Sequence, residues 1–432
     1  MADPYLIRPV SADESTAFHT VDQHAFHAGP VPDALLPITL RLFEFDRSLA
    51  AVDPALPASS GTGGIVGTAG AYSFELSVPG GQVPAAGVSF VSVLPTYRRR
   101  GILRSLMRRQ LSDIAQLGEP VAVLWASEAA LYGRYGYGRA SRQQKLTFRR
   151  GDGGLAADAP SDPSLSLRLA TPADVVADLA KVYGTVHASQ PGFFARNDAW
   201  WDRVLYDPES ERGGSSPLRC VLADDASGPR GYALYRATNR SEPGTFLPDS
   251  QLTIRELVAA DPAAAACLWR DLLSRDLVSE VTTRLRPDDD PIAFQLADSR
   301  RARVQSADGL WLRIVSLPSA LARRAYSCPV DVVLDVTDEL LPDNAGRWHL
   351  RAHGPAGGPA DGPADAGVTC ERTSRAADVE LGIRELGAAY LGGTRLGALA
   401  GAGLVRELRP GTLRTLSAAM SWDPAPWCPV IF

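Results

Sequence analysis

The chain has 432 residues, of which 45% are hydrophobic and 22% are charged, and its formal net charge is -5. This length indicates two to four domains, and the acidic balance argues against a general nucleic-acid binder, because phosphate binding requires a basic surface. The five cysteines are widely spaced and lack a Cys-x-x-Cys pair, which disfavours a zinc site or a disulfide framework and favours a reducing compartment.

The first residues carry no basic segment followed by an apolar run, so no signal peptide is expected. No apolar stretch approaches the roughly 20 residues that a membrane-spanning helix needs. We therefore expect a cytoplasmic protein that does not bind nucleic acid or membranes.

The first 150 residues alternate between apolar runs and helical patterns. Ser11, followed three residues later by Glu14, forms a capping box that predicts the start of a helix. The clearest helix is predicted at 101–117, where apolar residues recur on one face. Strands separated by such helices favour an α/β domain with a central sheet. The predicted strands are 5–10, 65–76 (a strand with a turn), 88–93, 120–125 and 145–149, the last of which closes the domain.

A second α/β segment follows a Gly, Ala, Asp and Pro-rich linker at 151–163 and runs to about residue 300. A strand at 252–258 and a helix at 263–273 repeat the strand-loop-helix order of 88–117, without the arginine triplet and the glycine. This order suggests an internal duplication whose second copy lost the site. The alternative is that strand-loop-helix units are common in α/β proteins.

The pattern changes again from about residue 300, where short strands and small-residue apolar segments alternate. The Gly, Pro and Ala tract 353–367 predicts a flexible surface loop. The chain ends on an apolar run, 427–432, which we expect to be buried together with its terminal carboxylate. The predicted strands are 330–336, 347–352 and 368–372, and the small-residue segments are 386–391 and 394–400.

The segment from Val91 to Arg104 carries the main candidate site. A strand ends, the chain turns through Arg98, Arg99 and Arg100, and a helix begins near Gly101. The free amides at a helix N-terminus and the helix dipole favour a bound anion, and the arginines add charge-assisted hydrogen bonds. The edge of the preceding strand can pair with an extended amide chain. These features describe a coenzyme A site, although three arginines can also be a solvated surface run.

A second segment, Trp125 to Gly138, contains three tyrosines. A tyrosine beside a thioester can protonate the departing thiolate, because its phenol keeps its proton at neutral pH. Tyr132, Tyr135 and Tyr137 are all candidates for this role. The alternative is that the cluster is aromatic packing with hydroxyls at its rim.

The motifs together resemble a known family. Arg98–Leu103 matches the pyrophosphate signature of the GNAT acetyltransferases, Arg/Gln-x-x-Gly-x-Gly/Ala, except that Leu103 replaces the small last residue. The stretches SFVSVLPTYRRRGILRSLM, ASEAALYGRYGYG and DGLWLRI, with the terminal phenylalanine, resemble the Eis (enhanced intracellular survival) family of actinobacterial acetyltransferases across essentially the whole chain.

The resemblance implies an α/β and α+β architecture of two tandem GNAT-type domains, the second degenerate, followed by a sterol-carrier-protein-like α+β domain. We place these domains at 1–150, 151–300 and 301–432. It also implies acetyl-CoA as co-substrate and a homohexamer of two stacked trimers. No metal is expected, because His24 and His27 have no nearby thiolate and no third ligand.

The resemblance assigns roles to individual residues. It makes Tyr132 the general acid and the free carboxylate of Phe432 the general base. An ordinary terminal carboxyl has a pKa of about 3.3–3.7, so burial of the chain end would have to raise this pKa for the carboxylate to act as a base. The alternative is that the tail only packs on the core. The positions where the family binds acetyl-CoA are Phe90, Val91, Val93, Arg98, Arg99, Gly101, Ile102, Leu103, Ser127 and Glu128, and the neighbouring Ser92, Arg100 and Arg104 complete the predicted set.

The acceptor pocket departs from the family pattern. Members that acetylate aminoglycosides have acidic residues before the Gly-Pro near residue 30 and next to the chain end. Here the first stretch reads Phe26-His27-Ala28-Gly29-Pro30, and Ile431 precedes the final residue. Phe26, Phe90 and Ile431 form the predicted substrate-binding set. We therefore expect acetyl transfer to a small-molecule or protein primary amine, with weaker binding of polycationic aminoglycosides. The alternative is a non-catalytic protein that binds CoA or an apolar ligand through the sterol-carrier-like domain.

Overall fold

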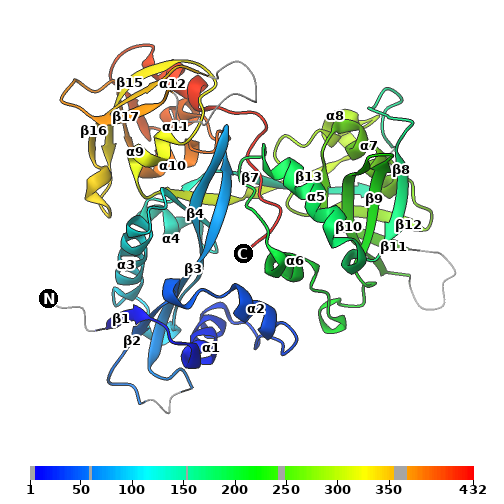
Figure 1. Ribbon diagram of the computed structural model, residues 1–432, viewed down its shortest axis with the longest axis horizontal. Helices are drawn as coiled ribbons and strands as arrows, with labels where there is room; N and C mark the ends of the chain where they lie inside the picture. The colour runs from blue at the N-terminus through cyan, green and yellow to red at the C-terminus, as the bar shows by residue number, and fades with distance from the viewer. Residues whose placement is uncertain (1–4, 58–60, 152–153, 242–248, 355–366) are drawn as a thin grey trace. The chain divides into compact units, whose positions relative to one another are not determined.

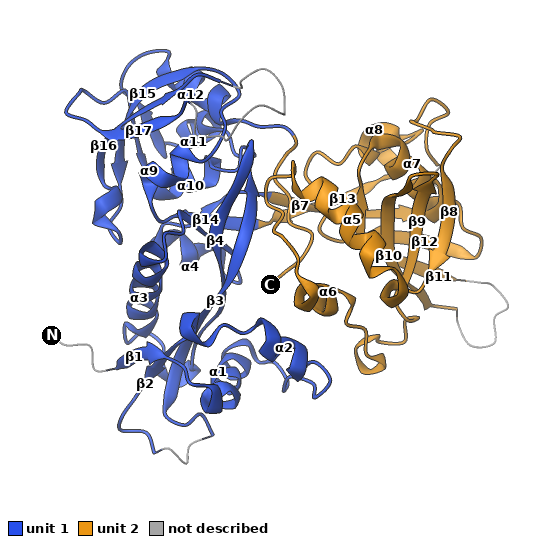
Figure 2. Ribbon diagram, viewed as in Figure 1, with its two compact units in different colours: residues 1–141, 310–423, 432 blue, residues 142–309, 424–431 orange. Residues whose placement is uncertain are grey.

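The computed structural model describes residues 5–57, 61–151, 154–241, 249–354 and 367–432. The chain forms two compact units (Figures 1 and 2). Unit 1 comprises residues 1–141, 310–423 and 432, and unit 2 comprises residues 142–309 and 424–431. The predicted loop at 353–367 lies almost wholly outside the described residues, as do residues 152–153 of the predicted linker.

Unit 1 contains a seven-stranded sheet built mainly from the first 140 residues. Buried residues alternate along β2, so that Leu49 and Ala51 pack under α3 while Ala50 packs under α1 on the opposite face. In spatial order the strands are β1 (Leu6–Pro9), β2 (Leu49–Val52), β3 (Ile65–Val78), β4 (Gly81–Val93), β5 (Val121–Trp125), β14 (Leu310–Ile314) and β6 (Gly138–Arg139). The helices are α1 (Ser15–Phe26), α2 (Leu36–Leu42), α3 (Ile102–Gln116) and α4 (Ala129–Tyr132).

Most of the predicted elements of this sheet are confirmed. The capping box is formed, since the Ser11 amide donates to the Glu14 carboxylate at 3.0 Å before α1 begins. The prediction of a turn within 65–76 is wrong, because β3 continues unbroken to Val78. Its glycines make room for neighbours instead: a Cβ on Gly67 would lie 2.9 Å from the Ile102 side chain of α3.

Unit 1 also contains a five-stranded sheet formed by the last third of the chain. The strands predicted at 330–336, 347–352 and 368–372 are confirmed, and the small-residue segments are short helices. In spatial order the strands are β17 (Thr369–Arg372), β16 (Gly346–Ala352), β15 (Val330–Thr337), β18 (Val379–Gly382) and β19 (Val405–Glu407). The helices are α9 (Leu317–Ala322), α10 (Ile383–Ala389), α11 (Leu396–Gly401) and α12 (Thr412–Met420).

Unit 2 is a second seven-stranded sheet with helices on both faces. In spatial order its strands are β13 (Arg303–Asp308), β7 (Arg142–Arg149), β12 (Val278–Thr283), β11 (Ser250–Ala259), β10 (Gly228–Asn239), β9 (Arg219–Asp225) and β8 (Ser166–Ala170). Its helices are α5 (Val176–His187), α6 (Asp198–Leu205), α7 (Pro262–Ser274) and α8 (Ile292–Gln295).

The strand predicted at 145–149 to close the first domain belongs instead to the second sheet. It is part of β7, which pairs with β12 and with β13. The place beside β5 in the first sheet is taken by β14, which pairs with β5 over five residues. The chain therefore passes from the first seven-stranded sheet to the second near residue 141 and returns to the first near residue 309. The domain limits at 150 and 300 stay predictions.

The apolar chain end is only partly buried. Trp427 packs against Phe193 in unit 2, and its indole N–H donates to the Leu285 carbonyl. The expectation of full burial is wrong for Ile431, whose side chain is 49% exposed within the chain. The hydrophobic anchor of the tail is thus Trp427 and Cys428 rather than its last residues.

A buried ion pair links the two sheets of unit 1. One terminal nitrogen of Arg313 on β14 donates to both carboxylate oxygens of Asp338, at 2.7 and 2.6 Å, and both side chains are essentially inaccessible. Asn344 also donates to this carboxylate at 3.0 Å. Because Arg313 makes no other described hydrogen bond, Asp338 compensates its charge alone.

We predict that Asp338→Ala lowers the free energy of unfolding by about 3–5 kcal/mol, because it leaves a buried guanidinium without a counter-charge. Urea titration followed by circular dichroism measures the change. Asp331→Ala is the control, since its carboxylate pairs with His349 at the surface and should contribute less than about 1 kcal/mol. An equal effect of the two substitutions would contradict this assignment.

Candidate functional site

The site begins at an irregularity in β4. Thr68 of β3 pairs with Ser92 and Gly70 pairs with Ser89, so two residues of β4, Phe90 and Val91, lie opposite one residue of β3. Phe90 has a φ of 53°, an uncommon value for a bulky residue, and its carbonyl accepts a hydrogen bond from the Thr68 hydroxyl at 2.8 Å. The bulge removes Val91 from the β3 register and leaves its backbone available to a ligand.

The neighbouring strands diverge at the same level. β4 and β5 pair in parallel only through 85–87 and 121–123. Beyond Gly87 the edge of β4 that faces β5 has no strand partner among the described residues. An extended amide chain could therefore add to this edge, as predicted for residues 91–93.

The turn after β4 leads into α3 through residues with positive φ. Arg99 has a φ of 63° and Gly101, the residue before the helix, has a φ of 86°. No side chain caps the N-terminus of α3. The amides of the first turn therefore lack a side-chain acceptor, and the helix dipole favours an anion there.

Arginines surround this helix end. Arg98, Arg99, Arg100 and Arg104 are exposed. In the described part of the chain, no carboxylate forms an ion pair with Arg98, Arg99 or Arg104, while Arg100 stacks over the Tyr97 ring at 4.6 Å. Guanidinium groups that lack a carboxylate partner, next to amides that lack a side-chain cap, favour the binding of an anion.

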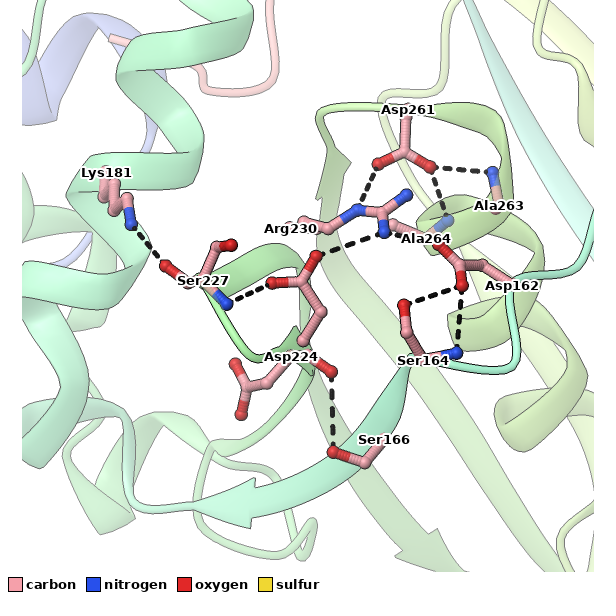
Figure 3. Close-up of polar contacts among 11 residues, drawn as sticks. Asp162, Ser164, Ser166, Lys181, Asp224, Ser227, Arg230, Asp261, Ala263 and Ala264 are labelled. Atoms are coloured by element: carbon pink, nitrogen blue, oxygen red, sulfur yellow. Dashed lines mark hydrogen bonds and ion pairs between the residues drawn. The ribbon is translucent and has the colours of Figure 1, made fainter.

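The corresponding helix of unit 2 has a different N-terminus (Figure 3). Asp261 caps α7, and one of its carboxylate oxygens accepts hydrogen bonds from the amides of Ala263 and Ala264 at 2.9 and 3.0 Å. The other oxygen pairs with Arg230 at 2.8 Å. Arg230 is also held by Asp162 at 2.6 Å. A built-in carboxylate thus occupies the position that an external anion takes at an uncapped helix, so the first-turn amides of α7 are satisfied within the chain.

Tyr132 ends the short helix α4 and is 4% exposed. Burial raises the pKa of its phenol, and the carboxylates of Glu128 and Asp22 add to the rise. A hydrogen bond with Ser127 opposes the shift. A phenol in this environment keeps its proton at neutral pH, as a general acid must. The structure therefore brings the predicted residues Tyr132, Ser127 and Glu128 together.

The other two tyrosines of this segment differ in their surroundings. Tyr137 is fully buried, its hydroxyl has no described hydrogen-bond partner, and burial raises its pKa. Its ring lies 6.0 Å from that of Tyr132 in an edge contact. Tyr135 is 9% exposed, and burial raises its pKa as well. Tyr137 is thus a core residue that packs behind Tyr132.

A row of aromatic rings extends from the chain end to the bulge. Phe432 makes an edge contact with Phe74 at 4.8 Å, Phe74 stacks on Tyr72 at 6.0 Å, and Tyr72 contacts Phe90 at 5.9 Å. The ring of Phe74 lies over Gly87, where an added Cβ would be 2.1 Å from it. Phe432 is therefore seated on β3 by Phe74, a contact that sequence patterns did not reveal.

Asp22 is a further member of the site that the sequence analysis missed. It lies on α1, is half-buried, and accepts a hydrogen bond from the buried Ser92 hydroxyl at the bulge. Burial raises the pKa of its carboxyl. Among the described residues no basic side chain forms an ion pair with it, and burial lowers the pKa of nearby His19 on the same helix. Asp22 is thus an uncompensated carboxylate close to Tyr132.

The remaining predicted substrate residues lie in different settings. Phe90 is surrounded by the rings of Phe18, His19 and Phe43. Phe26, the last residue of α1, is 49% exposed.

The described residues form neither a cluster of potential metal ligands nor a membrane-spanning helix. No three His, Cys, Asp or Glu side chains of the described chain cluster as metal ligands do. None of the described helices is long and apolar enough to cross a membrane.

Family models match most of the chain. Residues 6–140 match an acetyltransferase (GNAT) domain, residues 192–314 match a second acetyltransferase (GNAT) domain, and residues 317–429 match a sterol carrier protein domain. These matches confirm the predicted order of two GNAT domains and a sterol-carrier-like domain.

Whole-chain relatives agree with these matches. An N-acetyltransferase from Streptomyces coelicolor is 43% identical over 406 residues, 94% of each chain. The N-acetyltransferase Eis of Mycobacterium tuberculosis is 35% identical over 387 residues, 87% of this chain and 89% of the relative. The crystal structure of Eis1 from Mycobacterium abscessus is 33% identical, with a TM-score of 0.81 over 99% of this chain and 100% of that chain.

We predict that Asp22→Asn stabilises the protein at neutral pH, because it removes an unpaired charge and keeps an acceptor for Ser92. Folding raises the pKa of Asp22, so its ionised form costs stability above the folded pKa. This cost disappears as the pH falls below about 3.9, the ordinary pKa of an aspartate in the unfolded chain. The difference in melting temperature between the variant and the parent should therefore be largest near pH 8 and vanish in acid.

The exposed Asp33 provides the control, since Asp33→Asn should change the melting temperature little. A stability difference for Asp22→Asn that grows toward acid would contradict the account.

Proposed function

The chain belongs to the Eis family of GNAT N-acetyltransferases, and from this premise we propose that it moves an acetyl group from acetyl-CoA to a primary amine. The observation that carries the proposal is the uncapped N-terminus of α3, flanked by unpaired arginines and placed directly after the bulged strand β4. Together they offer a diphosphate site and a free strand edge in the chain order that an acyl-CoA requires.

The donor site is formed by the two segments named in the sequence analysis. The free edge of β4 would bind the amide arm, and the α3 amides with Arg98 and Arg99 would bind the diphosphate. The Val91 amide, outside the β3 register, would donate to the thioester oxygen as charge develops on it. The complete predicted set is Phe90, Val91, Ser92, Val93, Arg98, Arg99, Arg100, Gly101, Ile102, Leu103, Arg104, Ser127 and Glu128.

Proton transfer would be shared by two groups. Tyr132 would protonate the leaving thiolate, and its raised pKa supports this role because the phenol stays protonated until the sulfur needs the proton. The Phe432 carboxylate would accept a proton from the amine, directly or through water. The seating of its ring on Phe74 supports a fixed position for this carboxylate.

The acceptor is proposed to be less cationic than an aminoglycoside. Phe26 and Ile431 supply no charge to the predicted substrate-binding set, where aminoglycoside-acetylating members have acids. The carboxylates that act on the proposed acid are those of Glu128 and Asp22. Simple amines and lysine side chains are therefore the proposed acceptors, and the homohexamer stays a prediction from the resemblance.

The alternative of a binding protein without catalysis is not favoured. A cavity of about 890 Å³ lies at α11 and α12 in the sterol-carrier-like domain. Its lining combines the charged side chains Arg395, Glu407 and Arg414 with apolar residues such as Leu413 and Ala398, so the cavity does not separate the two candidate functions. The relatives of the whole chain are N-acetyltransferases, so the chain is an enzyme of this class.

We predict that Tyr132→Phe lowers kcat by about 10²–10⁴-fold, the usual contribution of a general acid. The affinity for CoA should not change, because the hydroxyl acts only on the leaving sulfur. Thiol release from acetyl-CoA in the presence of an amine measures kcat, and calorimetry measures CoA binding. Tyr137→Phe is the matched control, since its hydroxyl has no described partner, and equal losses in both variants would refute the assignment.

We also predict that one glycine added after Phe432 abolishes most of the turnover while folding and CoA affinity persist. The extension moves the carboxylate by about 3.5 Å without removing it from the chain. The melting temperature and a CoA titration of the extended protein serve as controls. Turnover equal to that of the parent enzyme would rule out the terminal carboxylate as the base.

A further inference from the structure

One half-buried carboxylate of unit 1, that of Asp22, has no part in the chemistry proposed so far. Its Oδ1 atom accepts a hydrogen bond from the Ser92 hydroxyl, while Oδ2 makes no hydrogen bond within the described part of the chain. Each carboxylate oxygen can accept about two hydrogen bonds. Because the Asp22 side chain is only half-buried, a ligand can reach the vacant oxygen from solvent.

The charge of this carboxylate is not compensated by a neighbouring cation. His19, one turn before Asp22 on α1, lies among aromatic rings, and burial lowers its pKa, which keeps the imidazole neutral at pH 7. Arg98 also reaches α1, but its Nη2 donates to the Ala25 carbonyl at 3.3 Å. Among the described residues no ion pair involves Asp22. A partly desolvated charge of this kind favours a cationic ligand.

Asp22 lies on the side of the bulge from which an amine can approach. Residues at the bulge point to opposite faces of the sheet: Val91 packs with apolar residues of α3. The Phe90 ring contacts Phe18 of α1, and the Ser92 hydroxyl bonds to Asp22 of the same helix. The proposed function places the thioester at the Val91 amide. An acceptor that enters along α1 therefore passes Asp22.

The position of Asp22 close to the proposed acid agrees with this path. Burial raises the pKa of Tyr132, and the negative charges of Glu128 and Asp22 raise it further, so both carboxylates are near the phenol. Glu128 is exposed, where water screens its charge. The half-buried Asp22 attracts a nearby cation more strongly, because the effective dielectric constant around it is lower.

Apolar side chains flank this carboxylate. Phe26 follows Asp22 by four residues, so the two side chains lie on the same face of α1. Phe26 is 49% exposed, and Phe90 at the bulge is half-buried. Both phenylalanines belong to the predicted substrate-binding set. One carboxylate between apolar rings is typical of a site for a small molecule that is mostly apolar and carries one charged group.

We propose that Asp22 binds the ammonium group of the acceptor and that Phe26 and Phe90 contact its apolar part. The inference rests on the proposed function and specifies its substrate class: a monoamine with an apolar body. A protonated amine supplies both the counter-charge and the donor that Oδ2 lacks, and the Ser92 hydroxyl orients the carboxylate. The amine then loses its proton to the Phe432 carboxylate, so Asp22 acts on binding rather than on transfer.

Binding is tested with two ligands of equal size, cyclohexylamine, which carries one positive charge at neutral pH, and cyclohexanol, which carries none. Calorimetry is performed on the intact protein saturated with CoA, so that no acetyl transfer occurs. The parent protein should bind the amine more tightly than the alcohol. Asp22→Asn should weaken amine binding about tenfold or more, as expected for a charge-assisted contact, and change alcohol binding by less than about twofold.

Two further variants serve as controls. Asp13→Asn removes the same charge from an exposed aspartate that precedes α1, and it should leave cyclohexylamine binding unchanged. Phe26→Ser removes an exposed apolar contact, so it should weaken binding of the amine and of the alcohol alike, by about threefold. The charge and the apolar contact are thereby tested separately.

The role in turnover is tested by thiol release from acetyl-CoA with cyclohexylamine as the acceptor. Asp22→Asn should raise KM about tenfold and change kcat by less than about threefold, because it removes an interaction made before the chemical step. A residue that only supports the fold would not produce this split between KM and kcat.

The outcomes separate this inference from the proposed function. Equal binding of cyclohexylamine by the parent and Asp22→Asn proteins would overturn the ammonium site, whether or not acetyl transfer occurs. A similar loss of amine and alcohol binding in Asp22→Asn would overturn it as well, since a structural role does not distinguish charge. Amine binding that depends on Asp22, without thiol release from acetyl-CoA, would support the ammonium site and overturn its assignment to the acceptor.

Discussion

The arrangement of the site depends on one constraint, the unsatisfied amides at the N-terminus of α3. A helix end without a side-chain cap favours an acceptor from elsewhere, and Gly101, the residue before α3, has no side chain that could cap it. The apolar face of α3, with Ile102 and Leu106, fixes this helix end against the sheet. The bulge at Phe90 and the divergence of β4 from β5 then place a free strand edge immediately before it.

The two seven-stranded sheets of the chain carry helices with different N-termini. In unit 2 the first turn of α7 is satisfied by Asp261, and Arg230 neutralises that carboxylate. In unit 1 no side chain caps α3, and among the described residues no carboxylate forms an ion pair with Arg98, Arg99 or Arg104. The chain itself supplies the anion at α7, while the proposed function assigns that place at α3 to the donor.

The amphipathic pattern of α3, the buried strands and the arginine turn were predictable from sequence, because they depend on residues close together in the chain. Asp22 and Ser92 meet only through tertiary folding, and no motif in the sequence marks Asp22 as part of the site. The sequence pattern of β7 predicted a strand but not the sheet to which it belongs, because its partners β12 and β13 lie more than 100 residues further along the chain. The domain order came from resemblance, and the family matches support it.

The central claim, that a diphosphate binds at the first turn of α3, is tested most directly by a calorimetric titration with CoA. The parent protein should bind, and the double variant Arg98→Glu/Arg99→Glu should lose at least about tenfold in affinity because two attractive charges become repulsive. Arg108→Glu, an exposed charge reversal further along α3, should bind CoA as the parent does. No heat of binding in the parent, or equal affinity in the double variant, would contradict the account.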